Sequence, residues 1–400
     1  MPSFYLLSTF TVTYLLYLSG IIRWEEAPGE LHFWCAVTIM ISAISFLTFQ
    51  KKINKIINDP DRLQEVKQPY LSNGFRWMLL GTLLLLGTVG ILKYIFDYAQ
   101  FVGAFGILLS IFTEDTGQLR TLADNVESWG TQLSYFSWLA AFVIAMDMGS
   151  KKLRYRWVAL ILFIVLLNAL FLDRTRPVWI IFTGVLCFFM TRYQHFTRKN
   201  IITILTSVIT FFLSLFVAIG SLLGKGADDE NYLTVDLPKW TQSIFLYLTS
   251  SFAYLGRLMY MDMPSNFYPA RVTYPVQKLL AKIQLVEQPP SQILEFFSLP
   301  LLTNVGTFLE PFYQDGGRLF LFLGIFIHTI AFDYWASALL KRSNVFSVIT
   351  VSTLCFTNFI AFFVPKITST ATWFIVLFAF LLWKADAVRD FFLQKRQRTS

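Results

Sequence analysis

Apolar runs about as long as a membrane is thick constrain the fold of this 400-residue chain more than any other feature. A helix needs about 20 mostly apolar residues to cross the hydrocarbon core of a bilayer. Hydrophobic residues make up 55% of the chain and charged residues 14%, and a soluble domain of this length cannot bury so much apolar surface. The sequence therefore predicts an all-α polytopic membrane protein with about ten transmembrane helices, which cover residues 4–22, 31–50, 77–98, 130–149, 157–173, 177–193, 201–223, 319–340, 345–364 and 370–385.

Lysine and arginine in the loops predict the orientation of these helices. Most of the 33 Lys and Arg residues fall in alternate loops or in the tail, and short basic loops stay in the cytoplasm. Both termini are then cytoplasmic, which agrees with an even number of spans. The net charge of +8 reflects this topology, so we expect no nucleic-acid partner. The basic segments are 51–76, 151–156, 192–199, 341–342 and the residues after 383.

The spacing of the spans divides the chain into three parts. Residues 1–223 hold seven spans with short loops, 224–318 form a large loop on the outer side, and 319–400 hold three spans and a basic cytoplasmic tail. The outer loop is too long for a plain connector. It contains two apolar stretches, 243–256 and 293–302, which are too short or too polar to span. We expect them to form amphipathic helices at the interface or against the bundle.

The cysteine and histidine content argues against a metal or disulfide framework. The chain has three cysteines, all inside apolar runs, and three histidines. The acidic stretch "DDE" (228–230) lacks further ligand spacing, so a solvated loop is a better interpretation than a divalent-metal site. We therefore predict no metal and no cofactor. The cysteines are Cys35, Cys187 and Cys355.

Several arginines lie on the predicted outer side, against the positive-inside trend. A guanidinium group presents a planar fork of donors that binds phosphate oxygens in pairs and keeps its proton. The competing interpretation is that each arginine reaches toward lipid headgroups or caps a helix. This alternative is weaker for Arg174 and Arg176, because two cations in one short turn repel each other and call for an anion. The outer arginines are Arg120, Arg174, Arg176, Arg257, Arg271 and Arg318.

A polar segment, residues 303–318, stands directly before the apolar run 319–340. Spacings of three predict that Asn304, Thr307 and Glu310 share one face of a helix, which Pro311 would end or kink. Gly316 and Gly317 would then let the chain turn before the span. The polar side chains of this segment are Asn304, Thr307, Glu310, Tyr313 and Asp315.

The end of this segment places a carboxylate next to a cation, Asp315 and Arg318. A carboxylate beside a basic group in a partly dry cleft is suited to act as a general base, and Glu310 or Asp315 fits that role. The competing interpretation is that Asp315 caps the next helix and Arg318 balances its charge.

Ionisable residues inside predicted spans are costly and need partners. Lys93 and Asp97 are four apart and are expected to pair, and Asp147 is expected to pair with Lys151. His328 and Asp333 are five positions apart, so they do not face each other on a helix. We expect both to have packing roles.

Two short motifs carry a resemblance to a known family. The turn "FLDRTRP" (171–177) is similar to an arginine-bearing turn, often Ser-Arg-Thr-Pro, between two middle spans of the bacterial O-antigen and capsular polysaccharide polymerases, the Wzy-type repeat-unit polymerases. The segment "LLTNVGTFLEPFYQDGG" (301–317) is similar to the family's Asn-x-x-Thr…Pro-Phe-x-x-Asp-x-Gly segment, which also follows a long outer loop. The first motif has aspartate here in place of serine.

This resemblance implies a GT-C-type membrane glycosyltransferase at the periplasmic face of the bacterial inner membrane. The growing glycan would leave its undecaprenyl pyrophosphate carrier and join the non-reducing end of a new lipid-linked repeat unit. The family also implies membrane lipids and a chain-length regulator as partners. Candidate pyrophosphate ligands are Arg174, Arg176, Arg257 and Arg271, with Arg120 and Arg318 as further candidates. Candidate bases are Glu310 and Asp315, and the remaining glycan contacts would be Asn304, Thr307 and Tyr313.

Two other functions stay open at this point. The related O-antigen ligases have a His-Asn pair where this chain has Thr303 and Asn304, so the missing histidine favours a polymerase over a ligase. A monosaccharide transferase with a polyprenyl donor uses the same broad chemistry. A lipid-linked oligosaccharide transporter would show paired repeats, and the sequence shows none.

Overall fold

A computed structural model describes most of the chain and shows a mostly helical protein. The chain forms two compact units. The first unit comprises Met1–Ile56, Lys225–Ala338 and Leu354–Trp373, and the second comprises Ile57–Gly224, Leu339–Thr353 and Phe374–Ser400. The described residues are 1–57, 73–102, 128–150, 155–171, 173, 175–192, 233–235, 237–261, 267–291, 294–295, 297–299, 302–342 and 344–399.

Most of the predicted apolar runs are helices in the structure. The run 201–223 lies outside the described residues, as do residues 103–112 and the acidic stretch 228–230. The helices that correspond to the other runs are α1 (Pro2–Leu18), α2 (Gly29–Ile57), α4 (Asn73–Val102), α7 (Gly130–Ser150), α8 (Tyr155–Ala169), α9 (Thr175–Arg192), α13 (Leu309–Phe326) with η3 (Ile327–Ala331) and α14 (Phe332–Leu339), α15 (Val345–Phe359) and α16 (Thr370–Thr399).

Among the residues that the structure describes, three helical segments are long and apolar enough to cross a membrane: Gly29–Ile56, Arg76–Gln100 and Leu309–Leu339. Each carries large apolar side chains that are exposed in the structure. Exposed apolar side chains of this kind are stable where lipid covers them. The chain is therefore consistent with an all-α membrane protein. These side chains include Phe33, Met40, Ile44 and Leu47 on α2, Met78, Leu85, Leu92 and Phe96 on α4, and Leu319, Phe322, Leu323 and Phe326 on α13.

Aromatic packing holds the first unit together. The Phe10 ring of α1 lies 5.1 Å from the Phe252 ring and 5.9 Å from the Phe308 ring, measured between centroids. Edge-to-face pairs of this kind add to the free energy of burial. Phe252 belongs to α11 (Lys239–Tyr260), the amphipathic helix expected around 243–256. A shorter helix, α12 (Tyr274–Lys282), follows it.

The second apolar stretch of the outer loop, 293–302, is not the helix we expected. It contributes a two-stranded antiparallel hairpin, β1 (Phe297–Ser298) and β2 (Leu302–Thr303), with Phe297 opposite Thr303. Pro300 stands between the strands in the sequence, and a proline disfavours a continuous helix there because it has no backbone N–H. A further turn of helix, η4 (Lys366–Thr368), follows α15.

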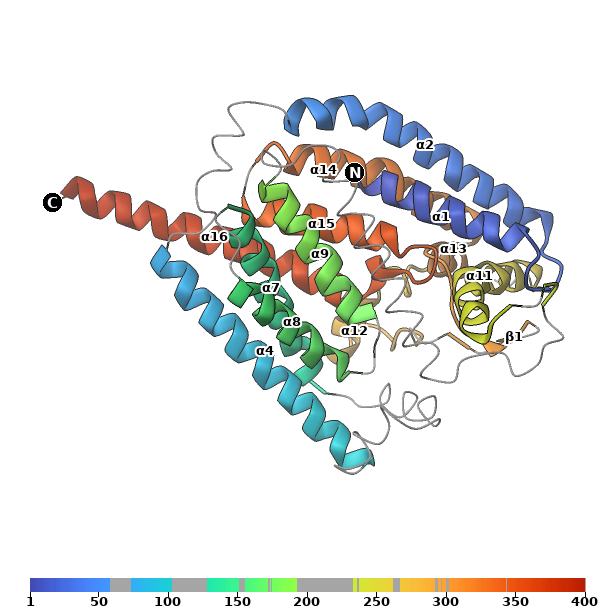
Figure 1. Cartoon of the computed structure of the whole chain (residues 1–400), viewed down its shortest axis with the longest axis horizontal. Helices are drawn as coiled ribbons and strands as arrows, with labels where there is room; N and C mark the ends of the chain where they lie inside the picture. Colours follow the sequence, from blue (N-terminus) through green and yellow to red (C-terminus); the bar gives the residue numbers. More distant parts are fainter. Residues whose placement is uncertain are drawn as a thin grey trace. The chain divides into compact units, whose positions relative to one another are not determined.

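In the second unit, α7 is buried along most of its length and contacts α4, α8 and α9 (Figure 1). The contact with α4 depends on two glycines, because a Cβ atom at Gly87 or Gly90 would lie 2.5 Å from a backbone nitrogen of α7. Small residues let helix backbones approach closely within a membrane.

The ionisable groups of α4 and α7 form ion pairs. Lys93 and Asp97 form the expected ion pair. Asp147 pairs with Arg76 of α4, whereas we expected Lys151, which lies outside the described residues. The tertiary contact between α4 and α7 supplies a cation that the local sequence spacing does not reveal.

Candidate functional site

The polar segment before α13 has a different local structure from the one its spacing predicts. Asn304 and Thr307 precede the helix, so the predicted helical face shared with Glu310 is wrong. The helix begins at Leu309, after Phe308, whose backbone N–H donates to the backbone oxygen of Ala361 at 2.8 Å. The hydroxyl of Thr307 accepts a hydrogen bond from the backbone N–H of Leu309 at 3.2 Å, which satisfies an N–H group that has no partner inside the helix.

The kink in α13 also lies elsewhere than expected. Pro311 belongs to the first turn of the helix. The N–H groups of this turn have no partner inside the helix, so a proline there costs no hydrogen bond. The chain bends at Gly316 and Gly317 instead. Gly317 has φ 58° and ψ −143°, a conformation that glycine adopts easily and other residues do not.

Glu310 is the least exposed carboxylate of this segment. Its side chain is 2% exposed, and Oε1 has no hydrogen-bond partner within the described residues. Gly306 makes room for it, since a Cβ atom there would lie 2.9 Å from Cγ of Glu310. Burial raises the pKa of the Tyr254 phenol above its ordinary value, and the nearby carboxylate of Glu310 raises it further. A buried carboxylate oxygen without a donor costs free energy, so this position calls for a functional explanation.

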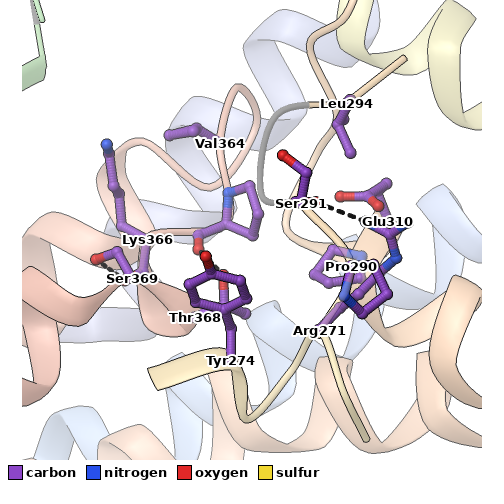
Figure 2. Close-up of a pocket in the computed structure, with 12 residues that line it drawn as sticks. Arg271, Tyr274, Pro290, Ser291, Leu294, Glu310, Val364, Lys366, Thr368 and Ser369 are labelled. Carbon is purple, nitrogen blue, oxygen red and sulfur yellow. Dashed lines mark hydrogen bonds between the residues drawn. The ribbon is translucent and has the colours of Figure 1, made fainter. Parts of the chain in front are cut away.

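Glu310 lines a pocket in the first unit, with a volume of about 170 Å³. One side of the pocket also carries Arg271, whose Nη1 donates to the backbone oxygen of Ser291 at 3.1 Å (Figure 2). This contact holds the guanidinium group at the same side as the carboxylate. The other lining residues of this side are Pro290, Leu294 and Pro311.

The facing side of the pocket comes from the turn between α15 and α16 (Figure 2). It contributes Lys366, Thr368 and Ser369 to the lining, and the Lys366 side chain extends away from Glu310 and Arg271 in Figure 2. The hydroxyl groups of Thr368 and Ser369 donate to the backbone oxygens of Pro365 and Lys366, each at 2.8 Å. The sequence analysis did not select these residues, although the position of Lys366 could have indicated one of them. The predicted topology puts this turn on the outer side, so Lys366 departs from the positive-inside trend, as the selected arginines do.

Asp315 is fully engaged with backbone groups. Its Oδ2 accepts hydrogen bonds from the backbone N–H groups of Arg271 and Val272 at 2.9 and 2.8 Å, and its Oδ1 accepts from Arg271 N–H at 3.1 Å. The hydrogen bonds described for Asp315 therefore run to the loop before α12. Asp315 fixes the backbone from which the Arg271 side chain enters the pocket. Of the two candidate bases, the geometry favours Glu310.

Two of the predicted phosphate ligands are paired with carboxylates just before α2 and in its first turn. Arg318 forms a two-pronged ion pair with Glu30, at 2.8 Å for both hydrogen bonds, and Arg257 lies 3.4 Å from Glu25. Neither arginine lines the pocket. The pocket also does not include Asn304, which is half-buried, or Tyr313, which packs in the core of the first unit.

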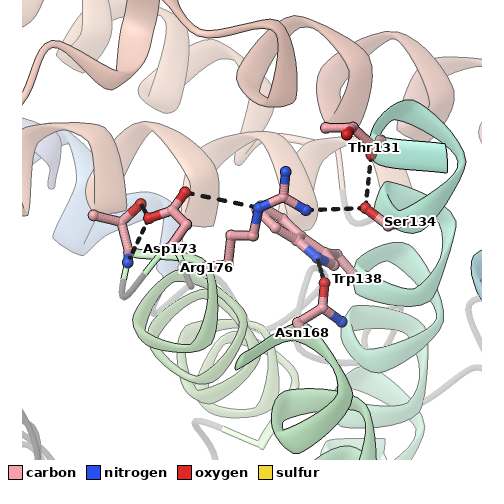
Figure 3. Close-up of polar contacts among 7 residues, drawn as sticks. Thr131, Ser134, Trp138, Asn168, Asp173 and Arg176 are labelled. Atoms are coloured by element: carbon pink, nitrogen blue, oxygen red, sulfur yellow. Dashed lines mark hydrogen bonds and ion pairs between the residues drawn. The ribbon is translucent and has the colours of Figure 1, made fainter. Parts of the chain in front are cut away.

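Arg176 lies in the second unit and is 8% exposed. Its Nη1 donates to Oγ of Ser134 at 3.1 Å, and its Nε lies 3.7 Å from Oδ2 of Asp173 (Figure 3). The guanidinium carbon lies 3.9 Å from the centroid of the Phe171 ring, which is a cation–π contact. These contacts hold the first turn of α9, where Asp173 also accepts a hydrogen bond from the backbone N–H of Thr175 at 2.9 Å.

Two predicted site residues, Arg120 and Arg174, lie outside the described residues.

Among the residues that the structure describes, no group of three or more His, Cys, Asp or Glu side chains is placed to hold a metal ion. The pocket instead offers one carboxylate and one guanidinium group, from Glu310 and Arg271. This pair can accept a proton and stabilise an anion.

In comparisons with models of protein families, with curated proteins and with solved structures, nothing matches this chain.

Proposed function

We propose that this protein is a membrane glycosyltransferase that polymerises lipid-linked oligosaccharide repeat units, with the pocket around Glu310 as its active site. The observation that carries the proposal is the Glu310 carboxylate, which is buried and has an oxygen without a partner among the described residues, in a pocket that Arg271 also lines. A base and a cation are groups that a sugar transfer from a pyrophosphate carrier requires.

The proposed step forms one glycosidic bond and breaks one sugar–phosphate bond. The hydroxyl oxygen at the non-reducing end of the new repeat unit attacks the anomeric carbon of the growing glycan. Glu310 takes the hydroxyl proton as general base. The bond between the anomeric carbon and the phosphate oxygen breaks, and its electron pair leaves with undecaprenyl pyrophosphate. Arg271 stabilises the charge that develops on this leaving group.

The remaining features of the proposal concern topology and partners. The chain crosses the bacterial inner membrane about ten times in a GT-C-type arrangement, with both termini in the cytoplasm and the pocket at the periplasmic face. The substrate is an undecaprenyl-pyrophosphate-linked oligosaccharide, and a chain-length regulator is the expected protein partner. The apolar, uncovered faces of α2, α4 and α13 support the membrane location.

A gel of the surface polysaccharide tests this proposal. A strain without the protein should carry a single repeat unit on its lipid anchor, and the wild-type protein should restore the ladder of polymer lengths. Glu310→Gln should leave the single unit while the protein accumulates normally, whereas Glu295→Gln, at an exposed carboxylate outside the pocket, should restore the ladder. Full-length polymer that is not attached to its anchor in the deletion strain would favour a ligase, and an absence of any exported repeat unit would favour a transporter.

A further inference from the structure

The short helix α12 has its apolar and polar faces reversed relative to a helix that packs on a protein core. Gln277 is 8% exposed, whereas Leu279 is 64% and Ile283 61% exposed. The buried amide is satisfied, because Oε1 of Gln277 accepts a hydrogen bond from the Tyr268 hydroxyl at 2.6 Å. The helix therefore uses its polar side to hold to the protein and turns apolar side chains outward. Leu285, just after the helix, extends this exposed apolar face.

The attachment of α12 places it at the edge of a candidate membrane span. Asp315 of α13 holds the backbone N–H groups of Arg271 and Val272, directly before α12 begins at Tyr274. The uncovered apolar row of α13 starts at Leu319, just past Asp315. Phe267, upstream of α12 and itself exposed, contacts the Phe320 ring of α13 at 6.3 Å between centroids. The exposed face of α12 is thus continuous with the end of a segment suited to lipid.

The charge of α12 fits an anionic surface. Lys278 and Lys282 lie on the helix, and residues 271–286 contain no aspartate or glutamate. Lysine beside an apolar face can bury its stem along the lipid while its ammonium group meets a headgroup phosphate.

We propose that α12 lies in the membrane surface, with Leu279, Ile283 and Leu285 inserted among acyl chains and Lys278 and Lys282 on anionic headgroups. The occupant of this face is a lipid surface rather than another protein. Since Arg271 and Tyr274, at the start of α12, also line the pocket, the insertion sets the pocket at the level of the headgroups. The inference does not depend on glycosyl transfer and would hold for a transporter or a ligase.

Fluorescent labels on single cysteines test the insertion in the full-length protein reconstituted in phosphatidylcholine–phosphatidylglycerol vesicles. Labels at Leu279→Cys and Ile283→Cys should be quenched by nitroxide-bearing lipid and protected from aqueous iodide. Phe322→Cys on α13 supplies a lipid-facing reference, and Glu295→Cys supplies an exposed reference outside α12. The native cysteines Cys35, Cys187 and Cys355 are buried and can be replaced by serine.

The outcomes distinguish a face buried in lipid from one exposed to water or covered by protein. Iodide quenching at 279 and 283 equal to that at Glu295→Cys would show that the face is in water and would overturn the proposal. Protection from both quenchers would show that protein covers the face, such as a second copy of the chain, and would equally overturn it. In vesicles of phosphatidylcholine alone, the quenching by nitroxide lipid should fall, and Lys278→Gln with Lys282→Gln should remove this dependence on anionic lipid. If the labelled chain that keeps both lysines shows identical quenching in the two vesicle types, the headgroup contact is refuted.

Discussion

Glu310 and Asp315 are two carboxylates on one short segment, and their surroundings give them different roles. Glu310 is buried with Oε1 unpartnered among the described residues, whereas Asp315 accepts hydrogen bonds from two backbone N–H groups. A carboxylate that is already bonded on both sides has less capacity to take a substrate proton. The proposed base is therefore Glu310, and Asp315 acts through the position of Arg271.

This difference predicts a distinct result for Asp315→Asn. The amide keeps one acceptor oxygen but loses the charge that strengthens the bonds to Arg271 and Val272, so the Arg271 side chain should be held less firmly. We expect a higher KM for the lipid-linked donor with a smaller change in kcat, measured with the purified protein. An equal loss of kcat in Asp315→Asn and Glu310→Gln would contradict the division of roles and favour a shared base.

Arg176 was selected from the sequence as a pyrophosphate ligand, and that role stays a prediction. Its contacts with Ser134 and Phe171 add a structural role at the start of α9. Arg176→Ala should lower the free energy of unfolding by about 1–3 kcal/mol, because it removes the cation–π contact with Phe171 and the hydrogen bond to the buried Ser134 hydroxyl. Thermal unfolding in detergent, followed by intrinsic fluorescence, measures this. Unchanged unfolding with loss of the polymer ladder would instead support direct binding of pyrophosphate.

The sequence identified the segment that carries the proposed site but could not rank its residues. Spacing and residue type select both Glu310 and Asp315, and only the contact with Arg271, which is 44 positions away, distinguishes them. Lys366 was missed for the same reason, since its place opposite Glu310 depends on how the chain folds back. Such long-range contacts leave no periodicity in a single sequence.

At the level of helices, length and apolarity were sufficient to predict most elements, because a membrane span is a long uniform pattern. The errors concern short elements in the outer loop. The stretch 293–302 forms a hairpin instead of a helix, and α13 begins at Leu309 rather than before Thr307. The residues before α13 make tertiary contacts, such as the hydrogen bond from Phe308 N–H to the Ala361 oxygen, which a spacing of three does not reveal.

The packing of α4 on α7 gives a test with a control on the same helix. A Cβ atom at Gly90 would lie 2.5 Å from the backbone nitrogen of Ser134, whereas one at Gly81 would have nothing within 4 Å. Gly90→Ala should lower the free energy of unfolding by about 1–3 kcal/mol through overpacking. Gly81→Ala should be neutral or slightly stabilising, since alanine favours a helix. Thermal unfolding of the two variants in the same detergent compares them, and equal midpoints would contradict the close approach.

At the scale of the whole molecule, the central claim is that one chain binds a lipid-linked glycan at a membrane surface and transfers it. The apolar faces of α2, α4 and α13 support the membrane location, and the pocket of the first unit holds the carboxylate of Glu310 and the guanidinium group of Arg271. The sequence predicted the membrane class from its long apolar runs and its composition. It could not predict how the turn between α15 and α16, the start of α13 and the loop before α12 meet around one cavity.

The most direct test is a reaction with purified protein in proteoliposomes that contain only undecaprenyl-pyrophosphate-linked repeat units. The account predicts a ladder of lipid-linked polymers together with released undecaprenyl pyrophosphate, without any nucleotide sugar. Glu310→Gln should slow the reaction by about 10²–10⁴-fold, the range for loss of a general base, and Glu295→Gln should react at the wild-type rate. A wild-type rate in Glu310→Gln would contradict the assignment of the base, and no polymer from the wild-type protein would contradict the proposed function itself.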